Sequence, residues 1–140
     1  MAANSRLTIA THSLAWLALA RRRGYDVLSS EQVAASVHTN PVVIRRCLGE
    51  LRRAGLVSVS RGAGWSLARE PHDITLLDVY DAIGAGSPFG LHHTEPNLEC
   101  PVGRGIRPVL RHVYQSVDGA VHRELERVTI ADVLRETLRA

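Results

Sequence analysis

The chain has 140 residues, of which 45% are hydrophobic and 22% charged, the composition of an ordinary globular domain with a buried core. No apolar run approaches the roughly 20 residues that cross a membrane. The apolar stretch near the start precedes its arginines, which is the reverse of a secretory signal. Two cysteines are too few for a disulfide framework. We therefore expect a cytoplasmic protein with no membrane partner.

Charge is unevenly distributed along the chain. Residues 1–70 carry ten arginines and four acidic residues, a balance of +6, whereas residues 71–140 carry seven arginines and ten acidic residues, a balance of −3. The chain has no lysine. This asymmetry indicates that the first half meets a polyanion, although charge scattered over the surface is the simpler alternative.

Two helices are predicted first. Apolar residues recur at helical spacing over residues 5–22, and Gly24 ends that pattern. Residues 29–37 predict a second, shorter helix, because Ser29 and Gln32 fit a capping box.

A third helix is predicted from residue 41 to about Ala54, where Gly55 stops it. Asn40 is a good N-cap and Pro41 a good first helical residue. Apolar residues at offsets 0, 3, 4 and 7 predict an inward face made of Ile44, Cys47, Leu48 and Leu51.

A hairpin and further helices follow. Residues 56–60 and 65–68 alternate apolar and polar side chains, as half-buried strands do, and the sequence RGAG joins them as a turn. Residues 75–83 predict a helix that begins with a capping box formed by Thr75 and Asp78. Residues 84–105 predict a loop, and residues 130–139 a short terminal helix. Before the terminal helix, a stripe of about five helical turns is formed by Leu110, Val113, Val117, Val121, Leu125 and Val128.

Two short helices joined by a turn and followed by a hairpin describe a winged helix-turn-helix, whose second helix enters the DNA major groove. Arg45 and Arg46 lie outward near the leading end of that helix, and arginine both reads guanine and clamps phosphate. Arg61 at the hairpin tip could enter the minor groove. The predicted DNA-binding residues are Thr39, Asn40, Val42, Arg45, Arg46, Ser58, Ser60, Arg61 and Gly62.

The strings NPVVIRRCLGELRRAGLVSVSRGAG, ITLLDVYDAIG and PNLECPVGRGIRPVL, in this order, resemble the Rrf2 family of bacterial transcriptional regulators, especially its YwnA-like branch. The resemblance covers nearly the whole chain. It implies a mainly α fold with a small β-hairpin wing, and a long C-terminal dimerisation helix. It also implies dimers that bind dyad-symmetric DNA operators. The expected organisation is a winged helix-turn-helix over 1–83, a sensor loop over 84–105, and dimerisation and terminal helices over 106–140.

The resemblance extends to single positions. Val42, Arg45 and Arg46 match recognition-helix positions, and Arg61 with Gly62 matches the wing. One departure lies in the wing, which usually has more glycines before its aromatic residue, whereas this chain reads Gly-Ala-Gly-Trp from position 62. A shorter, stiffer wing leaves the depth of arginine insertion open.

Well-studied members of the family hold an iron–sulfur cluster with three loop cysteines and one further ligand. This chain has only Cys100 in that loop, and adding His12, His92 or His93 falls short of about four ligands. Zinc bound by both loop histidines, Glu95 and Cys100 does not match a known zinc spacing. We therefore expect no cluster, no other cofactor and no metal site.

The same cysteine is a candidate thiol sensor. Cys100 precedes the Pro-Val-Gly of residues 101–103, where backbone N–H groups could lower its pKa, and Arg104 and Arg107 could help. Two copies of the cysteine in a dimer could pair with each other, or one could take a small-thiol cap. An inert, structural cysteine is the open alternative. Cys47, on the inward face of the third helix, is expected to be plain core.

The motifs of enzymes are missing: we find no nucleophile–base pair, glycine-rich phosphate loop or metal motif at usable spacing. We expect a dimeric DNA-binding transcriptional regulator, a repressor, that responds to thiol oxidation at Cys100. The long apolar stripe predicts the homodimer, because so small a winged helix cannot cover it alone. Two alternatives stay open: the signal is a metal or small ligand, or the fold serves as an adaptor that docks a protein on its arginines.

Overall fold

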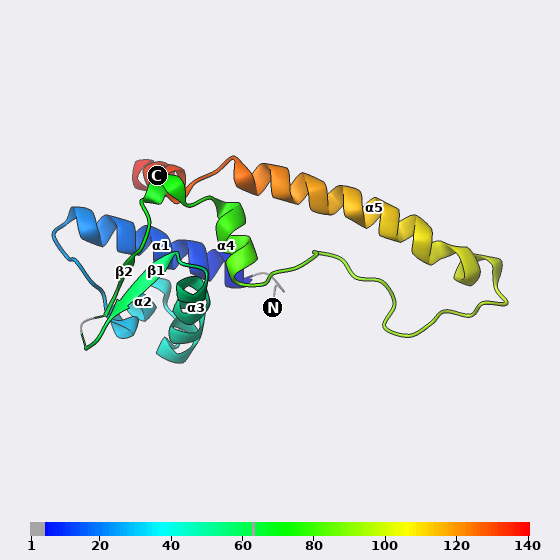
Figure 1. The fold of residues 1–140 in the computed structure, drawn as a ribbon, viewed down its shortest axis with the longest axis horizontal. Coiled ribbons are helices and arrows are strands. Elements are labelled where there is room, and N and C mark those ends of the chain that lie inside the picture. The colour runs from blue at the N-terminus through cyan, green and yellow to red at the C-terminus, as the bar shows by residue number, and fades with distance from the viewer. Residues whose placement is uncertain (1–4, 63) are drawn as a thin grey trace.

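The computed structural model describes residues 5–62 and 64–140 and shows a helical body from which one long helix projects (Figure 1). Met1, Ala2, Ala3, Asn4 and the wing residue Ala63 lie outside the described residues. The expected mainly α fold with a two-stranded antiparallel wing is confirmed. In chain order its elements are α1 (Ser5–Arg22), α2 (Ser30–Val37), α3 (Pro41–Arg53), β1 (Val57–Ser60), β2 (Gly64–Leu67), the 3₁₀ helix η1 (Pro71–Asp73), α4 (Leu76–Ala82), α5 (Pro101–Glu126) and α6 (Ile130–Arg139).

The hydrophobic core of the body gathers buried side chains from both ends of the chain. Leu14 of α1, Leu48 of α3, Val79 of α4 and Ile130 of α6 have no solvent exposure. Each such side chain contributes roughly 1.5–3 kcal/mol to folding when it leaves water. Helix α6 therefore packs against α1 and ties the C-terminal end of the chain to the helical body.

Helix starts follow the local signals in the sequence. The Ser29 hydroxyl accepts a hydrogen bond from the Gln32 amide at 3.1 Å, and the Gln32 side chain accepts from the Ser29 amide at 2.8 Å. Thr75 and Asp78 form the same reciprocal pair before α4. Both predicted capping boxes are confirmed, and a third, not predicted, begins α6 at Thr129.

Helix α5 begins earlier than expected, at Pro101 with Cys100 as its N-cap, so residues 101–105 are helical and were wrongly predicted as loop. The loop was expected there because residues 84–105 are rich in Gly, Pro, His and Asn. Pro108 lies inside the helix, where it removes one N–H donor. The 26 residues of α5 make an arm about 39 Å long.

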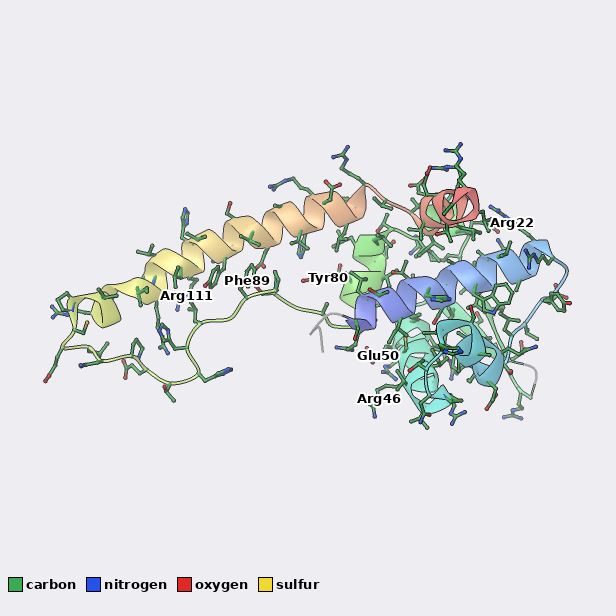
Figure 2. All side chains as sticks on the ribbon, turned by 180° about the vertical axis from the view of Figure 1, so that it is seen from behind. Arg22, Arg46, Glu50, Tyr80, Phe89 and Arg111 are labelled. Carbon is green, nitrogen blue, oxygen red and sulfur yellow. The ribbon has the colours of Figure 1, made fainter. Side chains whose placement is uncertain are left out.

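The loop after α4 runs outward from the body to the far end of this arm, and α5 returns from there (Figure 1). The rings of Phe89 and Tyr114 lie 5.6 Å apart, and the Ser87 hydroxyl donates to the Asp118 carboxylate at 2.8 Å. Figure 2 shows Phe89 on the loop facing α5. These two contacts hold the first part of the loop against the long helix.

None of the helices in the described ranges combines the length and the apolar character that a membrane crossing requires.

Candidate nucleic-acid interface and thiol site

Helix α3 is presented by a turn that leaves its N-terminus exposed. His38 ends α2 in the left-handed conformation, with φ of 67°, and turns the chain toward α3. The Asn40 side chain caps α3 by accepting from the Val42 amide at 2.8 Å. The free N–H groups of this first turn carry the positive end of the helix dipole, which attracts a phosphate.

The two faces of α3 are divided as predicted. The inward set is buried, and Cys47 retains 9% of its exposure as its most accessible member. Val42 is 54% exposed on the opposite face, and Arg45 and Arg46 are also exposed. Thr39, in the turn, is half-buried. This arrangement brings the predicted groove-reading side chains together at the leading end of one helix.

Arg45 and Arg46 have different surroundings. Arg45 Nη1 lies 3.1 Å from the Glu31 carboxylate of α2, a partner that was not predicted. Helical periodicity assigns residues to the faces of one helix but does not show how two helices cross. It therefore cannot predict a contact between residues of two helices. Arg46 has no carboxylate within ion-pair distance among the described residues, and Figure 2 shows it extending from the body.

The wing carries the remaining predicted contacts. Ser58 and Ser60 on β1 and Arg61 and Gly62 at the turn are all exposed. The base of the wing is fixed, because the Trp65 indole N–H donates to the Ser30 hydroxyl of α2 at 3.0 Å. The wing and α2 therefore form one surface.

The glycine at position 64 of the wing has a steric reason. Gly64 has φ of +115°, and a Cβ there would lie 2.5 Å from the carbonyl oxygen of Leu28. Trp65 and Leu28 exchange backbone hydrogen bonds of 3.0 and 2.7 Å beside it. The second glycine of the wing is therefore required by a close backbone approach.

A helix-turn-helix with an attached wing and a long helical arm is matched over residues 3–136 by the Rrf2 family model, described as an iron-dependent transcriptional regulator. The chain belongs to the Rrf2 family. Within it, the chain is 38% identical to YwnA of Bacillus subtilis strain 168, a helix-turn-helix-type transcriptional regulator by name, over 94% of this chain and 96% of that protein.

Solved structures agree with this assignment to the Rrf2 family. A DNA-binding protein of known crystal structure is 36% identical with a TM-score of 0.74, covering 93% of this chain and 99% of its own. CymR, the global cysteine regulator of B. subtilis, is 25% identical with a TM-score of 0.63, covering 91% of this chain and 94% of its own. The protein is thus an Rrf2-family DNA-binding transcriptional regulator and not an enzyme.

Cys100, in the loop that precedes the Rrf2 long helix, is exposed at the N-terminus of α5. The nearby backbone N–H groups of Gly103 and Val102 lower the pKa of its thiol, because they stabilise the thiolate. Arg104 and Arg107 were expected to help, but their guanidinium groups donate to loop carbonyls instead.

The loop is wrapped tightly around this first turn. The Cys100 amide donates to the Asn97 carbonyl at 3.3 Å, and Arg104 Nε donates to the Leu98 carbonyl at 3.0 Å. A Cβ on Gly103 would lie 2.1 Å from the Asn97 carbonyl oxygen. Gly103 therefore leaves room for the loop backbone to lie against the helix. The sequence pattern after Cys100 did not predict this role.

The family model is described as iron-dependent, and binding iron requires a set of protein ligands. About four protein ligands hold an iron–sulfur cluster. Cys100 supplies one, Cys47 is buried in the core, and His12 bonds the Ser36 hydroxyl at 2.9 Å. Among residues 5–62 and 64–140, no three His, Cys, Asp or Glu side chains are grouped to hold a metal ion. The donors of one chain therefore do not fit a cluster.

Proposed function

We propose that this protein is a homodimeric, cytoplasmic repressor that binds a dyad-symmetric operator and releases it when Cys100 is oxidised. The observation that carries the proposal is the exposed Arg45–Arg46 pair beside the Asn40-capped start of α3, with the opposite face of that helix buried. A guanidinium pair at a helix N-terminus suits guanine edges and backbone phosphates. Occupying a promoter with such a dimer blocks transcription.

Helix α5 supports the homodimer. None of its residues is buried. Val102, Val109 and Val113 are large apolar side chains left exposed on its first half, whereas the other members of the predicted stripe are half-buried. A second copy of the helix covers such a stripe by self-complementary packing. A dimer built in this way spaces two α3 helices for half-sites about 34 Å apart.

The exposed Cys100 thiolate supports the redox response. It attacks a hydroperoxide, breaks the O–O bond and becomes a sulfenic acid, while the leaving oxygen takes up a proton as water or alcohol. A second thiol, from a small molecule or the other copy, then displaces water to form a disulfide. No iron–sulfur cluster takes part in this scheme. Because the loop beside Cys100 follows α5 back to α4, modification there can alter the spacing of the recognition helices.

A mobility shift with a DNA fragment from upstream of the protein's own coding sequence tests the proposal. Affinity should fall steeply with salt, because bound phosphates release counterions. Peroxide should release the wild type and Cys47→Val from the fragment but leave Cys100→Ser bound. Adding the protein to a promoter transcribed in vitro should lower transcript yield. An unchanged peroxide response in Cys100→Ser would place the sensor elsewhere, and salt-independent binding would favour a protein-docking role.

A further inference from the structure

A small cavity lies where the recognition helix α3 meets α1 and the end of α4. Its volume is about 90 Å³, or roughly three water volumes of 30 Å³. Its walls are apolar and come from Ile9 of α1, Val43 and Cys47 of α3, and Ile83 just after α4. Such walls favour a short hydrocarbon chain over water, which needs several polar partners.

Charged side chains complete the rim of this cavity. Arg6 Nη2 lies 2.7 Å from the Glu50 carboxylate and also donates to the Ile83 carbonyl, so Glu50 is neutralised by its partner. Arg46, the third charged side chain of the rim, has no such carboxylate among the residues described. Figure 2 shows Arg46 and Glu50 on α3 below the start of α1. The mouth therefore carries one uncompensated positive charge.

We propose that this cavity binds a short-chain monocarboxylate, whose alkyl chain fills the apolar walls and whose carboxylate pairs with Arg46. A carboxylate matches the two parallel N–H groups of a guanidinium better than any neutral group of the same size. The cavity volume restricts the ligand to a chain of a few carbons. Binding is non-covalent, because burial keeps the Cys47 thiol protonated, and a protonated thiol is a poor nucleophile.

Arg46 also belongs to the predicted DNA-binding face, so one guanidinium serves two anions. A second step rests on the proposed function. A bound carboxylate holds Arg46 back from the operator and so weakens DNA binding. The ligand would then reach the recognition helix from its inner side, far from the thiol at the other end of the α5 arm.

Nuclear magnetic resonance of the ¹⁵N-labelled full chain tests the site without DNA. Sodium propionate is compared with propionamide, its uncharged isostere, and with sodium chloride at equal ionic strength. Propionate should shift the amide signals of Ile9, Val43, Cys47 and Ile83, and should bind about tenfold or more tightly than propionamide, the value of a charge-assisted hydrogen-bond pair. Arg46→Gln should remove that preference.

Filling the cavity gives the matched variants. Ile9→Phe and Cys47→Met each add volume from a different helix, so that one remains informative if the other fails to fold. Neither residue is among the predicted DNA contacts. Both variants should lose the propionate shifts, and in a mobility shift at constant ionic strength propionate should weaken DNA binding by the wild type only.

Four results would overturn the inference or its coupling to DNA binding. Equal shifts with propionate and chloride, or shifts that survive both filled variants, would show that the cavity is not the site. Equal affinity for propionate and propionamide would show that charge is not recognised. Cavity binding without any change in DNA affinity would refute the coupling to Arg46. If the untreated protein did not bind the operator at all, the proposed function would be contradicted instead. The resonance experiment would still show whether the cavity binds propionate.

Discussion

The guanidinium of Arg45 on α3 lies 3.1 Å from the carboxylate of Glu31 on α2. Both side chains are at least half exposed, at 50% and 67%, so the pair itself adds at most about 1 kcal/mol to stability. Its consequence is local: the carboxylate holds the arginine at the leading end of the recognition helix, yet also brings a negative charge toward any approaching phosphate. Removing the Arg45 guanidinium should therefore weaken DNA binding, whereas removing the Glu31 charge should strengthen it.

Replacing Arg45 or Arg46 by alanine should weaken operator binding by about 1–3 kcal/mol if the side chain reads a base. Arg45→Ala leaves the Glu31 carboxylate unpaired near phosphate, so the double variant with Glu31→Gln should bind DNA more tightly than Arg45→Ala alone. Fluorescence anisotropy with a labelled operator measures all of these dissociation constants.

Arg52→Ala is the matched control for this experiment. Arg52 is an exposed arginine in the last turn of α3, remote from the leading end, where the negative end of the helix dipole stabilises its positive charge. It should change affinity little at fixed salt. Full affinity in both Arg45→Ala and Arg46→Ala would show that the recognition surface lies elsewhere.

Much of the DNA-binding fold was predictable because its signals are local. A capping box needs residues three apart, and the inward face of α3 needs only helical spacing, so Ser29, Gln32 and Leu48 could be placed from the sequence. The arginines of the candidate site were found in the same way, as what remains when the buried set is removed.

What escaped prediction depends on contacts between distant segments. The Arg6–Glu50 pair joins α1 to α3 across 44 residues, and no spacing rule links those positions. The requirement for Gly103 comes from the Asn97 backbone lying against it. The start of α5 was placed too late, because the glycines and the proline of residues 101–105 favour a loop locally, although the long helix includes them.

Val113→Arg should leave a folded monomer that binds the operator weakly. Val113 is 46% exposed, so a charge there disturbs a proposed partner helix rather than the body of the protein. Gln115→Arg adds the same charge about 200° around α5 and should leave the dimer intact. Sedimentation velocity at micromolar concentration distinguishes the two variants. A monomeric wild type at that concentration would contradict the homodimer.

Iodoacetamide should label Cys100 much faster than Cys47 near neutral pH. Backbone N–H groups lower the pKa of the exposed Cys100 thiol, whereas burial raises the pKa of the Cys47 thiol to about 11. Because the thiolate is the reacting species, the labelling rate of Cys100 should level off at a lower pH than that of a free cysteine. Peptide mass spectrometry after timed quenching gives both rates. Equal rates at the two cysteines would remove the basis for a sensor at the start of α5.

Stability should fall in alkaline solution because of Cys47. Burial, together with the negative charge of Glu50, raises the pKa of this thiol from its ordinary value of 9.0 to about 11, and Arg6 opposes the shift. In the unfolded chain the thiol ionises near 9.0, so between that pH and about 11 the unfolded state binds fewer protons and gains stability relative to the folded state. The contribution is fully present below 9.0 and is lost as pH rises through the folded pKa.

Urea unfolding in a Cys100→Ser background measures this loss. Between about pH 8 and about pH 10.5 the protein with Cys47 should lose about 2 kcal/mol more than the variant with Cys47→Val, which has no thiol to ionise. Tyr80, whose pKa burial also raises, is present in both proteins and cancels in the difference. Valine keeps the apolar packing beside Leu48 and Ile44, so the two proteins should differ little below pH 8. Parallel pH profiles for the two would mean that the Cys47 thiol ionises as it would in water, and that water reaches the inner side of the recognition helix.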